Sequence, residues 1–424
     1  MPMLLGTKGE DILQWRASAQ LVDKLEAGLS SKWGRSSARE ADSFLCGLIA
    51  SLQEELSYES QFDHETAALD RAIAQAKAPV DLQPLQARYR ELASAHFRRR
   101  NSVLALCGVC GHLHDMVLTR AAALAEERML QLGQGSAPIY ALLVSGDRGR
   151  QETTLYSRNR YLLLHELDSP RFFLFSHQLS VALKEAGVLM GDDMLWHGSL
   201  SEWRALLGAA APHRQEGGQE SFPSPLPPFA TQSRPGPQPI PEWNWRLEAM
   251  ADLCFVTGYE RLAADALSAA ARAVQEQRNR EPFLQLARRV IHLPLALGHF
   301  GRWRLQRDGE HKGELDLEEF ALAPMVMAVR VLAVYAGVHG GGTVQRVREL
   351  LNKGALDVDL SERLLKAFQC FMQLRIDSEI RSEQNGAFSN PEEFSQELDA
   401  RLRASFEAVL NLQKIAYQRL VAQG

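Results

Sequence analysis

Two arginines separated by one residue, Arg158 and Arg160, have the chemistry and spacing to hold an anion. Alternate residues that enter a strand point to the same side, so both guanidiniums are expected to project into one cleft. Such a pair binds phosphate or carboxylate oxygens directly. The alternative is a solvated charge pair of little energetic value. The acids that could balance such a pair are Asp147, Glu152, Glu166 and Asp168.

A second group, Cys107, Cys110, His112 and His114, contains the ligand types that zinc prefers. No second ligand pair follows at the spacing of a zinc finger. On a helix, positions 107, 110 and 114 share a face, whereas 112 points elsewhere. We therefore predict buried core cysteines and no metal ligands here.

The elements that position the arginines are two short apolar runs, Ile139–Val144 and Tyr161–Leu164. Apolar runs of this length beside Gly and Ser are typical of buried strands. The stretch Phe172–Ala186 has helical character and stops at Gly187, a residue that favours a left-handed helix end. Together these segments predict a small α/β unit.

The rest of the chain has helical patterns on both sides of one break. Nine of the 18 prolines lie between Pro212 and Pro241, and proline excludes helix and central strand, so we predict an extended connector. Residues 10–130 are expected to be helical. A C-terminal bundle helix is predicted from one apolar stripe, made of Leu402, Phe406, Val409, Leu410, Tyr417 and Leu420.

Composition excludes several classes of protein. Of the 424 residues, 46% are hydrophobic and 23% charged, as in ordinary globular proteins, and the net charge of −5 argues against general nucleic-acid binding. No run approaches the ~20 apolar residues of a membrane span, so no membrane partner is expected. Five cysteines, an odd number, fit reduced thiols, and the start of the sequence lacks the pattern of a secretory signal. We expect a cytoplasmic protein.

The segment from the first strand to the second resembles the nucleotidyltransferase-like domain of a bacterial family related to protein-PII uridylyltransferase. That family carries G-S-x-G-R-x-E-x-x-L-x-[ST]-D-x-D between two strands. The matching residues are Gly146, Gly149, Arg150, Glu152, Leu155 and Ser157. The resemblance implies that the glycine turn holds nucleotide phosphates and that the D-x-D carboxylates hold two magnesium ions. Gly149 and Glu152 are interpreted as scaffold residues of the turn.

The departures from this pattern change the expected chemistry. Asp147 replaces the family's serine, and Arg158 and Arg160 replace the two metal-binding aspartates. Arginine stays protonated and has no lone pair for a metal. A guanidinium ~4 Å from a divalent ion costs on the order of several kcal/mol at an effective dielectric of about 20. The sequence therefore predicts that no metal binds at these positions.

The resemblance continues downstream over roughly residues 85–424. The stretch Gly187–Trp203 matches a conserved family pattern in which Asp193 replaces the usual asparagine. Beyond the connector, Asp252, Val256 and Gly258 match the opening of the family's helical substrate-binding domain. Further cleft candidates in that domain are His299, Arg302 and Arg304.

We predict an α+β, mostly helical protein with four parts. These are a helical region (1–130), a nucleotidyltransferase-like α/β domain (131–212), a Pro-rich connector (213–243) and a helical substrate-binding domain (244–424). The predicted function is that of a catalytically degenerate protein in bacterial signalling, which senses a nucleotide or another anion or acts as a scaffold for a protein partner.

The predicted anion site consists of Gly146, Asp147, Gly149, Arg150, Glu152, Arg158 and Arg160, with no catalytic residue and no cofactor. The alternative is an active nucleotidyltransferase whose Mg²⁺ is held by Asp147, Asp192 or Asp193.

Overall fold

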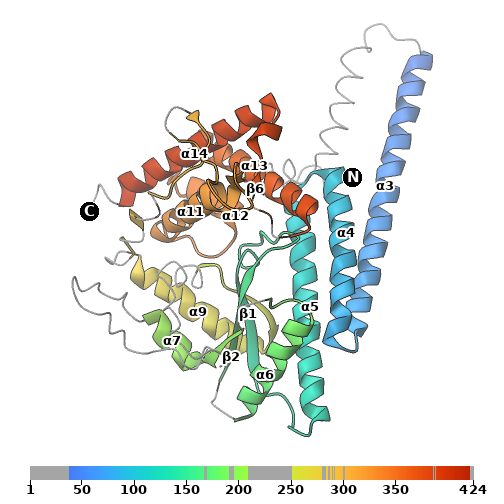
Figure 1. Cartoon of the computed structure of the whole chain (residues 1–424), viewed down its shortest axis with the longest axis vertical. Coiled ribbons are helices and arrows are strands. Elements are labelled where there is room, and N and C mark those ends of the chain that lie inside the picture. Colours follow the sequence, from blue (N-terminus) through green and yellow to red (C-terminus); the bar gives the residue numbers. More distant parts are fainter. Residues whose placement is uncertain are drawn as a thin grey trace.

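The fold is described from a computed structural model. The structure describes residues 38–166, 170–190, 195–208, 251–278, 283–284, 287–288, 290, 292–298, 301–384, 386 and 388–420. The Pro-rich connector lies outside these residues. Figure 1 shows helices on both sides of one small sheet, as predicted for an α+β, mostly helical protein. Among the described residues, no helix is long and apolar enough to span a bilayer.

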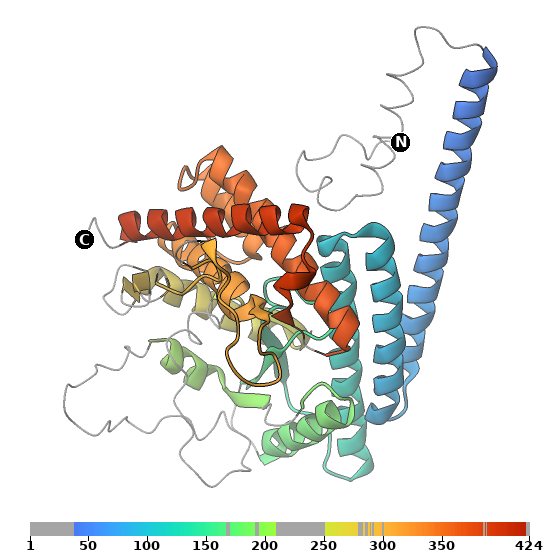
Figure 2. The ribbon, with the colours of Figure 1, turned by 45° about the horizontal axis from the view of Figure 1, so that its top comes forward.

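Three helices form the N-terminal part. They are α3 (Ala38–Gln75), α4 (Leu82–Arg100) and α5 (Val103–Gln131), with the short 3-10 turn η1 (Pro79–Asp81) between the first two. All three run alongside one another, and α3 continues past the end of α4 (Figure 2). The helical prediction for this region is confirmed over its described part.

The sheet has four strands in the order β3-β2-β1-β4. They are β1 (Tyr140–Gly146), β2 (Asn159–His165), β3 (Leu195–Ser199) and β4 (Cys254–Gly258). β1 is antiparallel to both β2 and β4, whereas β2 and β3 are parallel. The two predicted strands are therefore confirmed.

Both faces of this sheet are buried, which explains why its central strands are continuous apolar runs. Leu142 and Val144 of β1 pack in one core with α5 and with α6 (Pro170–Glu185). Ala141 and Leu143 point to the other core, which contains α7 (Leu200–Gly208) and α9 (Glu260–Gln277).

The helix predicted over 172–186 is confirmed as α6, and its end follows the predicted glycine stop. Gly187 has φ +73°, and its N–H donates to the Lys184 carbonyl at 3.0 Å. The Val188 N–H donates to the Leu183 carbonyl at 2.9 Å. These two bonds satisfy carbonyls that would otherwise be unpaired at the helix end.

β4 corrects the expectation that residues 244–424 are helical throughout. Asp252, Val256 and Gly258 were matched to the opening of a helical domain, but Val256 and Gly258 lie in a strand, β4, which pairs with β1. Gly258 has φ +106°, and a Cβ there would lie 2.4 Å from the Tyr140 carbonyl oxygen, so the pairing requires glycine. The four-stranded sheet therefore contains strands from both sides of the predicted boundary at 244.

The C-terminal part is a helical bundle around α11. Its helices are α11 (Ala323–Tyr335), α12 (Thr343–Asn352), α13 (Val358–Ser382) and α14 (Gln396–Leu420). α11 is buried on nearly all sides, as expected for a helix that is apolar all round. Smaller elements complete this part: the π-helical turn η3 (Glu318–Leu322), the 3-10 turn η4 (Pro391–Glu393) and the two-stranded sheet of β5 (Leu315–Asp316) and β6 (Phe388–Ser389).

The predicted stripe on α14 is correct in part. Leu402, Phe406, Val409 and Leu420 are buried, but Leu410 and Tyr417 are exposed. The buried face instead includes Gln413 and Ala416, which continue the four-and-three spacing from Val409. Hydrophobic residue type alone placed the two exposed side chains on the wrong face.

Candidate functional site

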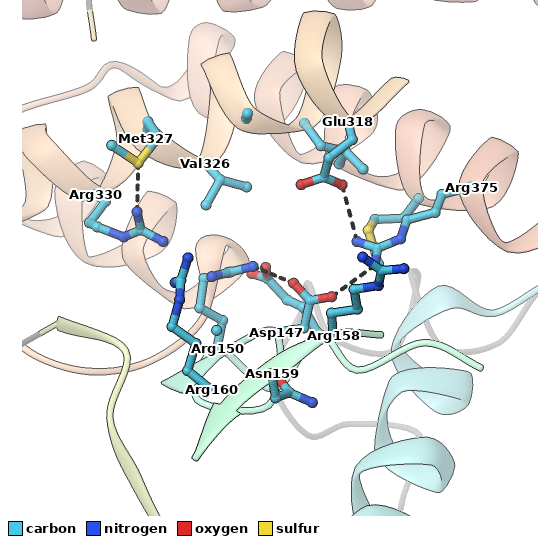
Figure 3. Close-up of a pocket in the computed structure, with 15 residues that line it drawn as sticks. Asp147, Arg150, Arg158, Asn159, Arg160, Glu318, Val326, Met327, Arg330 and Arg375 are labelled. Carbon is cyan, nitrogen blue, oxygen red and sulfur yellow. Dashed lines mark hydrogen bonds and ion pairs between the residues drawn. The ribbon is translucent and has the colours of Figure 1, made fainter. Parts of the chain in front are cut away.

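A cavity of about 400 Å³ lies between the sheet and the helical bundle. Figure 3 shows the turn after β1 and the start of β2 on one side, and η3, α11 and α13 on the other. We call it the first cavity. Its lining residues are Gly146, Asp147, Arg150, Glu152, Arg158, Asn159, Arg160, Glu318, Leu322, Ala323, Val326, Met327, Arg330, Met372 and Arg375.

The turn after β1 folds tightly because glycines accept two demanding positions. Gly146 has φ +99°, and its carbonyl accepts the Arg150 N–H at 3.1 Å. A Cβ on Gly149 would lie 1.4 Å from the carbonyl oxygen of Asp252, so only glycine lets that segment approach. Gly149 therefore does not line the cavity but holds the turn against the segment before β4.

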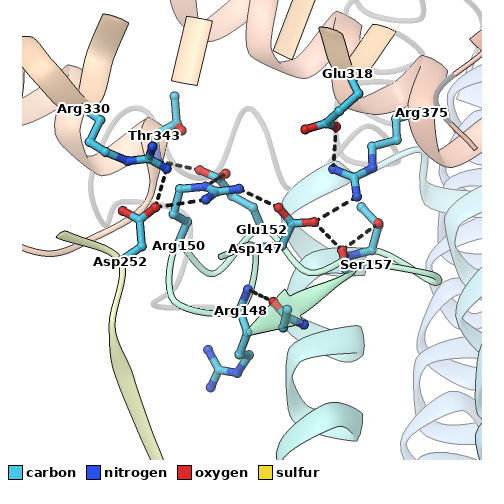
Figure 4. Close-up of polar contacts among 12 residues, drawn as sticks. Asp147, Arg148, Arg150, Glu152, Ser157, Asp252, Glu318, Arg330, Thr343 and Arg375 are labelled. Carbon is cyan, nitrogen blue, oxygen red and sulfur yellow. Dashed lines mark hydrogen bonds and ion pairs between the residues drawn. The ribbon is translucent and has the colours of Figure 1, made fainter. Parts of the chain in front are cut away.

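Arg150 is a buried cross-link between three carboxylates (Figure 4). Its guanidinium contacts Asp147 at 2.5 Å, Glu152 at 2.7 Å and Asp252 at 3.0 Å. Burial opposes the charged form of Arg150, but the three carboxylates outweigh it and raise the pKa of the guanidinium. Its positive charge is thus committed to neighbours in the protein.

Asp147 has both carboxylate oxygens occupied. Oδ1 accepts from Arg150, while Oδ2 accepts from the Ser157 hydroxyl at 2.7 Å and from Arg375 at 2.9 Å. Burial would raise the pKa of Asp147, but Arg375 and Arg150 hold it below its ordinary value. A metal ion could use these oxygens only after the ion pairs had broken.

Glu152 and Glu379 connect the turn to the helical bundle. Glu152 Oε1 accepts the Thr343 N–H at 2.6 Å, at the start of α12. Glu379 of α13 accepts the Thr154 hydroxyl at 2.7 Å and pairs with Arg375 at 3.1 Å. The interpretation of Glu152 as a scaffold residue agrees with these bonds.

A single carboxylate, Asp252, pairs with three guanidiniums. Besides Arg150, it contacts Arg330 of α11 and Arg346 of α12, the latter at 2.8 Å. Burial would raise the pKa of Asp252, but Arg330, Arg346 and Arg150 lower it far below its ordinary value. We call Asp252 and these three arginines the Asp252 node.

Sequence reasoning missed Arg330, Arg346 and Arg375. A signal was available for Arg330, which is the one charged residue in the apolar helix 323–335. Charged residues are almost never fully buried unless they are paired, so an arginine there indicates a buried ion pair. Its partner comes from a segment 78 residues away and leaves no local pattern.

Arg158 and Arg160 both line the first cavity, and both are exposed, so they lie at its mouth (Figure 3). Arg160 is opposite Ser145 of β1, and this register turns it toward the helical bundle. Two of the acids expected to balance the pair, Asp147 and Glu152, bond Arg150 instead. Asp168 lies outside the described residues.

The lining of the first cavity carries a positive excess. Five arginines and three acidic residues line it, which leaves two formal positive charges. One wall is apolar and is formed by Leu322, Ala323, Val326, Met327 and Met372. The cavity therefore combines cationic groups with an apolar surface.

Of the other predicted cleft residues, the structure describes Arg302 and Arg304. Asp192, Asp193 and His299 are outside the described residues. Neither Arg302 nor Arg304 lines the first cavity. The Arg304 guanidinium instead lies 5.5 Å from the centre of the Phe320 ring, a cation–π distance.

The cysteine and histidine group does not converge on one point. Cys107 and Cys110 are buried, and burial raises the pKa of both thiols, so they remain protonated. His112 bonds Asp70 at 2.9 Å, and His114 bonds the Tyr161 hydroxyl at 3.1 Å. Across the described part of the chain, no group of three or more potential metal ligands is assembled.

Two family models match the chain on either side of the first cavity. The model described as "putative nucleotidyltransferase DUF294" matches residues 87–216, and the one described as "putative nucleotidyltransferase substrate binding domain" matches residues 280–420. No curated protein matches the chain. The two matched ranges contribute the two sides of the cavity, and together they show that the chain belongs to the family that these two descriptions name.

Proposed function

We propose that this chain is a catalytically degenerate member of the family that binds a phosphate-bearing anion through arginines, without a metal ion. One observation carries the proposal: Arg158 and Arg160 lie at the mouth of the first cavity. In the resemblance described above, they stand at the two positions where the family has its metal-binding aspartates. The role that fits is regulatory, as an anion sensor or as a scaffold whose contacts respond to the anion.

The residues present do not fit a divalent ion. Of the three acidic residues that line the first cavity, Asp147 and Glu152 are held by Arg150, and Glu318 lies 3.5 Å from Arg375. Magnesium needs carboxylate or phosphate oxygens that are free to coordinate it. The exposed guanidiniums of Arg158 and Arg160 beside the same space would repel the ion. We therefore derive no reaction step through magnesium.

An organic phosphate fits the same lining. Guanidiniums form paired, charge-assisted hydrogen bonds with phosphate oxygens. The apolar wall around Val326 and Met327 could receive an uncharged part of the ligand, such as a nucleobase. The family name refers to nucleotides, so ATP and UTP are the first ligands to test.

The alternative is an active transferase whose Mg²⁺ is held by Asp147, Asp192 or Asp193. For Asp147, it requires the ion pairs with Arg150 and Arg375 to open. It predicts binding that depends on Mg²⁺ and transfer of a nucleoside monophosphate. The relation to protein-PII uridylyltransferase stays a prediction.

The test is calorimetric titration of the whole chain with ATP and UTP, first with Mg²⁺ and then with EDTA. We expect binding that survives EDTA, weakens with added salt and falls on the order of 100-fold in Arg158→Ala/Arg160→Ala, since a hydrogen bond to a charged group contributes about 1.5–3 kcal/mol. The matched control is Arg71→Ala/Arg88→Ala, which removes two exposed charges from α3 and α4, away from the cavity lining.

Three results would contradict the proposal. Binding that needs Mg²⁺ and tolerates loss of both arginines would support the transferase alternative. An equal loss of affinity in the control would assign the effect to net charge rather than to the site. No heat in either buffer would exclude anion sensing with these ligands.

A further inference from the structure

A second cavity of about 250 Å³ lies on the other side of the Asp252 node. It is formed by the segment before β4, by α9 and by the region where α11 ends and α12 begins. At about 30 Å³ for each water molecule, its volume corresponds to on the order of eight waters. This is enough room for a small organic molecule.

The walls of the second cavity are mainly apolar. Leu253, Leu267, Val274, Val334 and Val338 all contribute to them. Water gains few hydrogen bonds against such walls, so an apolar ligand would replace it favourably. The lining thus favours a molecule with a hydrocarbon part.

One buried cation, Arg346, interrupts this apolar lining. Its side chain is 2% exposed. Nε donates to the Gly340 carbonyl at 3.3 Å, and Nη2 donates to the Ala251 carbonyl at 2.7 Å and lies 2.8 Å from Asp252 Oδ1. Nη1 is buried and has no acceptor among the described residues. A buried donor without an acceptor is destabilising.

The charge of Arg346 is also only partly compensated. Asp252, its carboxylate partner, is shared with Arg150 and Arg330. Burial lowers the pKa of Arg346, and Asp252 opposes this effect without cancelling it. One further negative charge beside Arg346 would stabilise the guanidinium.

We propose that the second cavity binds a small carboxylic acid with a short hydrocarbon chain, its carboxylate beside Arg346 and its chain against the leucine and valine walls. A carboxylate supplies the single negative charge that would balance the guanidinium. A phosphate dianion fits less well, because its additional charge and oxygens would be desolvated against apolar walls. This site is independent of the function proposed for the first cavity.

Hexanoate and hexanamide are suitable probes, because they share a chain and differ in charge. We expect hexanoate to bind the whole chain at pH 7 in a calorimetric titration, with one site per chain. Hexanamide should bind at least about tenfold more weakly, because the charge-assisted bond to Arg346 is lost.

Ala271→Trp tests the location without touching the buried network. Ala271 is exposed on α9 and lines the second cavity, so a tryptophan there would narrow its entrance. Ala264→Trp is the matched control, since Ala264 is exposed on the same helix and does not line the cavity. We expect hexanoate affinity to fall at least about tenfold in the first variant and to change less than about twofold in the second.

The proposal is overturned if hexanoate does not bind, if hexanamide binds equally well, or if both tryptophan variants lose affinity to the same extent. It is also overturned if Ala271→Trp leaves the binding unchanged while Arg158→Ala/Arg160→Ala removes it. That last result would assign hexanoate to the first cavity.

Discussion

The arginines of the first cavity and of the Asp252 node form two groups that differ in burial and therefore in role. Arg150, Arg330, Arg346 and Arg375 are buried and hold carboxylates from distant segments. The Arg158–Arg160 pair is exposed at the cavity mouth. A buried guanidinium must be paired to be tolerated, whereas an exposed one stays solvated and its ion pairs contribute little to stability.

This difference shows how the two matched parts of the chain are held together. Arg375 of α13 reaches Asp147 in the turn, and Glu152 of the turn reaches the first residue of α12. These contacts close the back of the first cavity, while its mouth keeps a positive excess. The buried arginines thus hold the walls of the cavity in place, and we expect the exposed arginines to bind the ligand.

The largest effect on stability is expected for Asp252→Asn, which tests the structural role of the buried arginines. The change leaves three buried guanidiniums around a neutral amide, and removal of one partner from a buried ion pair costs about 3–5 kcal/mol. Urea unfolding of the whole chain measures this loss. Asp359→Asn is the control, because that carboxylate is 82% exposed and lies 3.6 Å from Arg363, so a change within about 0.5 kcal/mol is expected. Equal effects in the two variants would contradict a structural role for the node.

Gly149→Ala tests the close approach on which the node depends. The new Cβ would fall 1.4 Å from the Asp252 carbonyl oxygen, so the two segments must separate. We expect a loss of about 1–3 kcal/mol in the free energy of unfolding, as for other overpacked sites. Gly108→Ala in α5, where a Cβ meets no atom within 4 Å, should be neutral or slightly stabilising. A tolerated Gly149→Ala would show that the turn and the segment before β4 are not tightly joined.

Acid should weaken the ion pairs of the buried arginines, and so lower the free energy of unfolding, over a defined pH range. The pKa values of Asp147 and Asp252 are lowered in the folded chain, so their contribution to stability is complete above the ordinary carboxyl pKa of 3.8. It is lost as the pH falls from that value through the folded-state pKa, by about 1.4 kcal/mol for each unit of lowering.

Urea midpoints between pH 5 and pH 2 measure this dependence, and Asp252→Asn should flatten the slope. The variant lacks Asp252, one of the two carboxylates named above, so it has less stability to lose on acidification. An unchanged slope in the variant would separate acid sensitivity from the node.

The sequence was a good guide to elements whose patterns are local. The apolar runs at 139–144 and 161–164 are strands, and Gly187 ends α6, because each depends on a few neighbouring residues. β4 was missed, because the likeness of its segment to a helical domain outweighed a five-residue pattern. The partners Arg330, Arg346 and Arg375 were missed because they meet the turn only after the chain has folded.

For the candidate site, the sequence indicated which residues belong to the turn but not which of them already form ion pairs within the protein. Asp147 and Glu152 were predicted to contribute to anion binding, yet both are committed to arginines. Which arginine a carboxylate pairs with depends on packing between segments hundreds of residues apart. The orientation of Arg160 likewise required the register of β2 against β1.

The smallest change in stability is expected for the exposed arginines, and this variant best distinguishes them from the buried ones. Arg158→Ala/Arg160→Ala removes exposed charges, so the free energy of unfolding without ligand should change by less than about 0.5 kcal/mol. With ATP at about 100 times its dissociation constant, the unaltered chain should gain about 2.7 kcal/mol, and the variant, with about 100-fold weaker binding, should gain about 0.4 kcal/mol. A large loss of stability without ligand would place the pair with the structural arginines. A small loss together with an abolished ligand effect would separate the arginines that hold the fold from those that bind the anion.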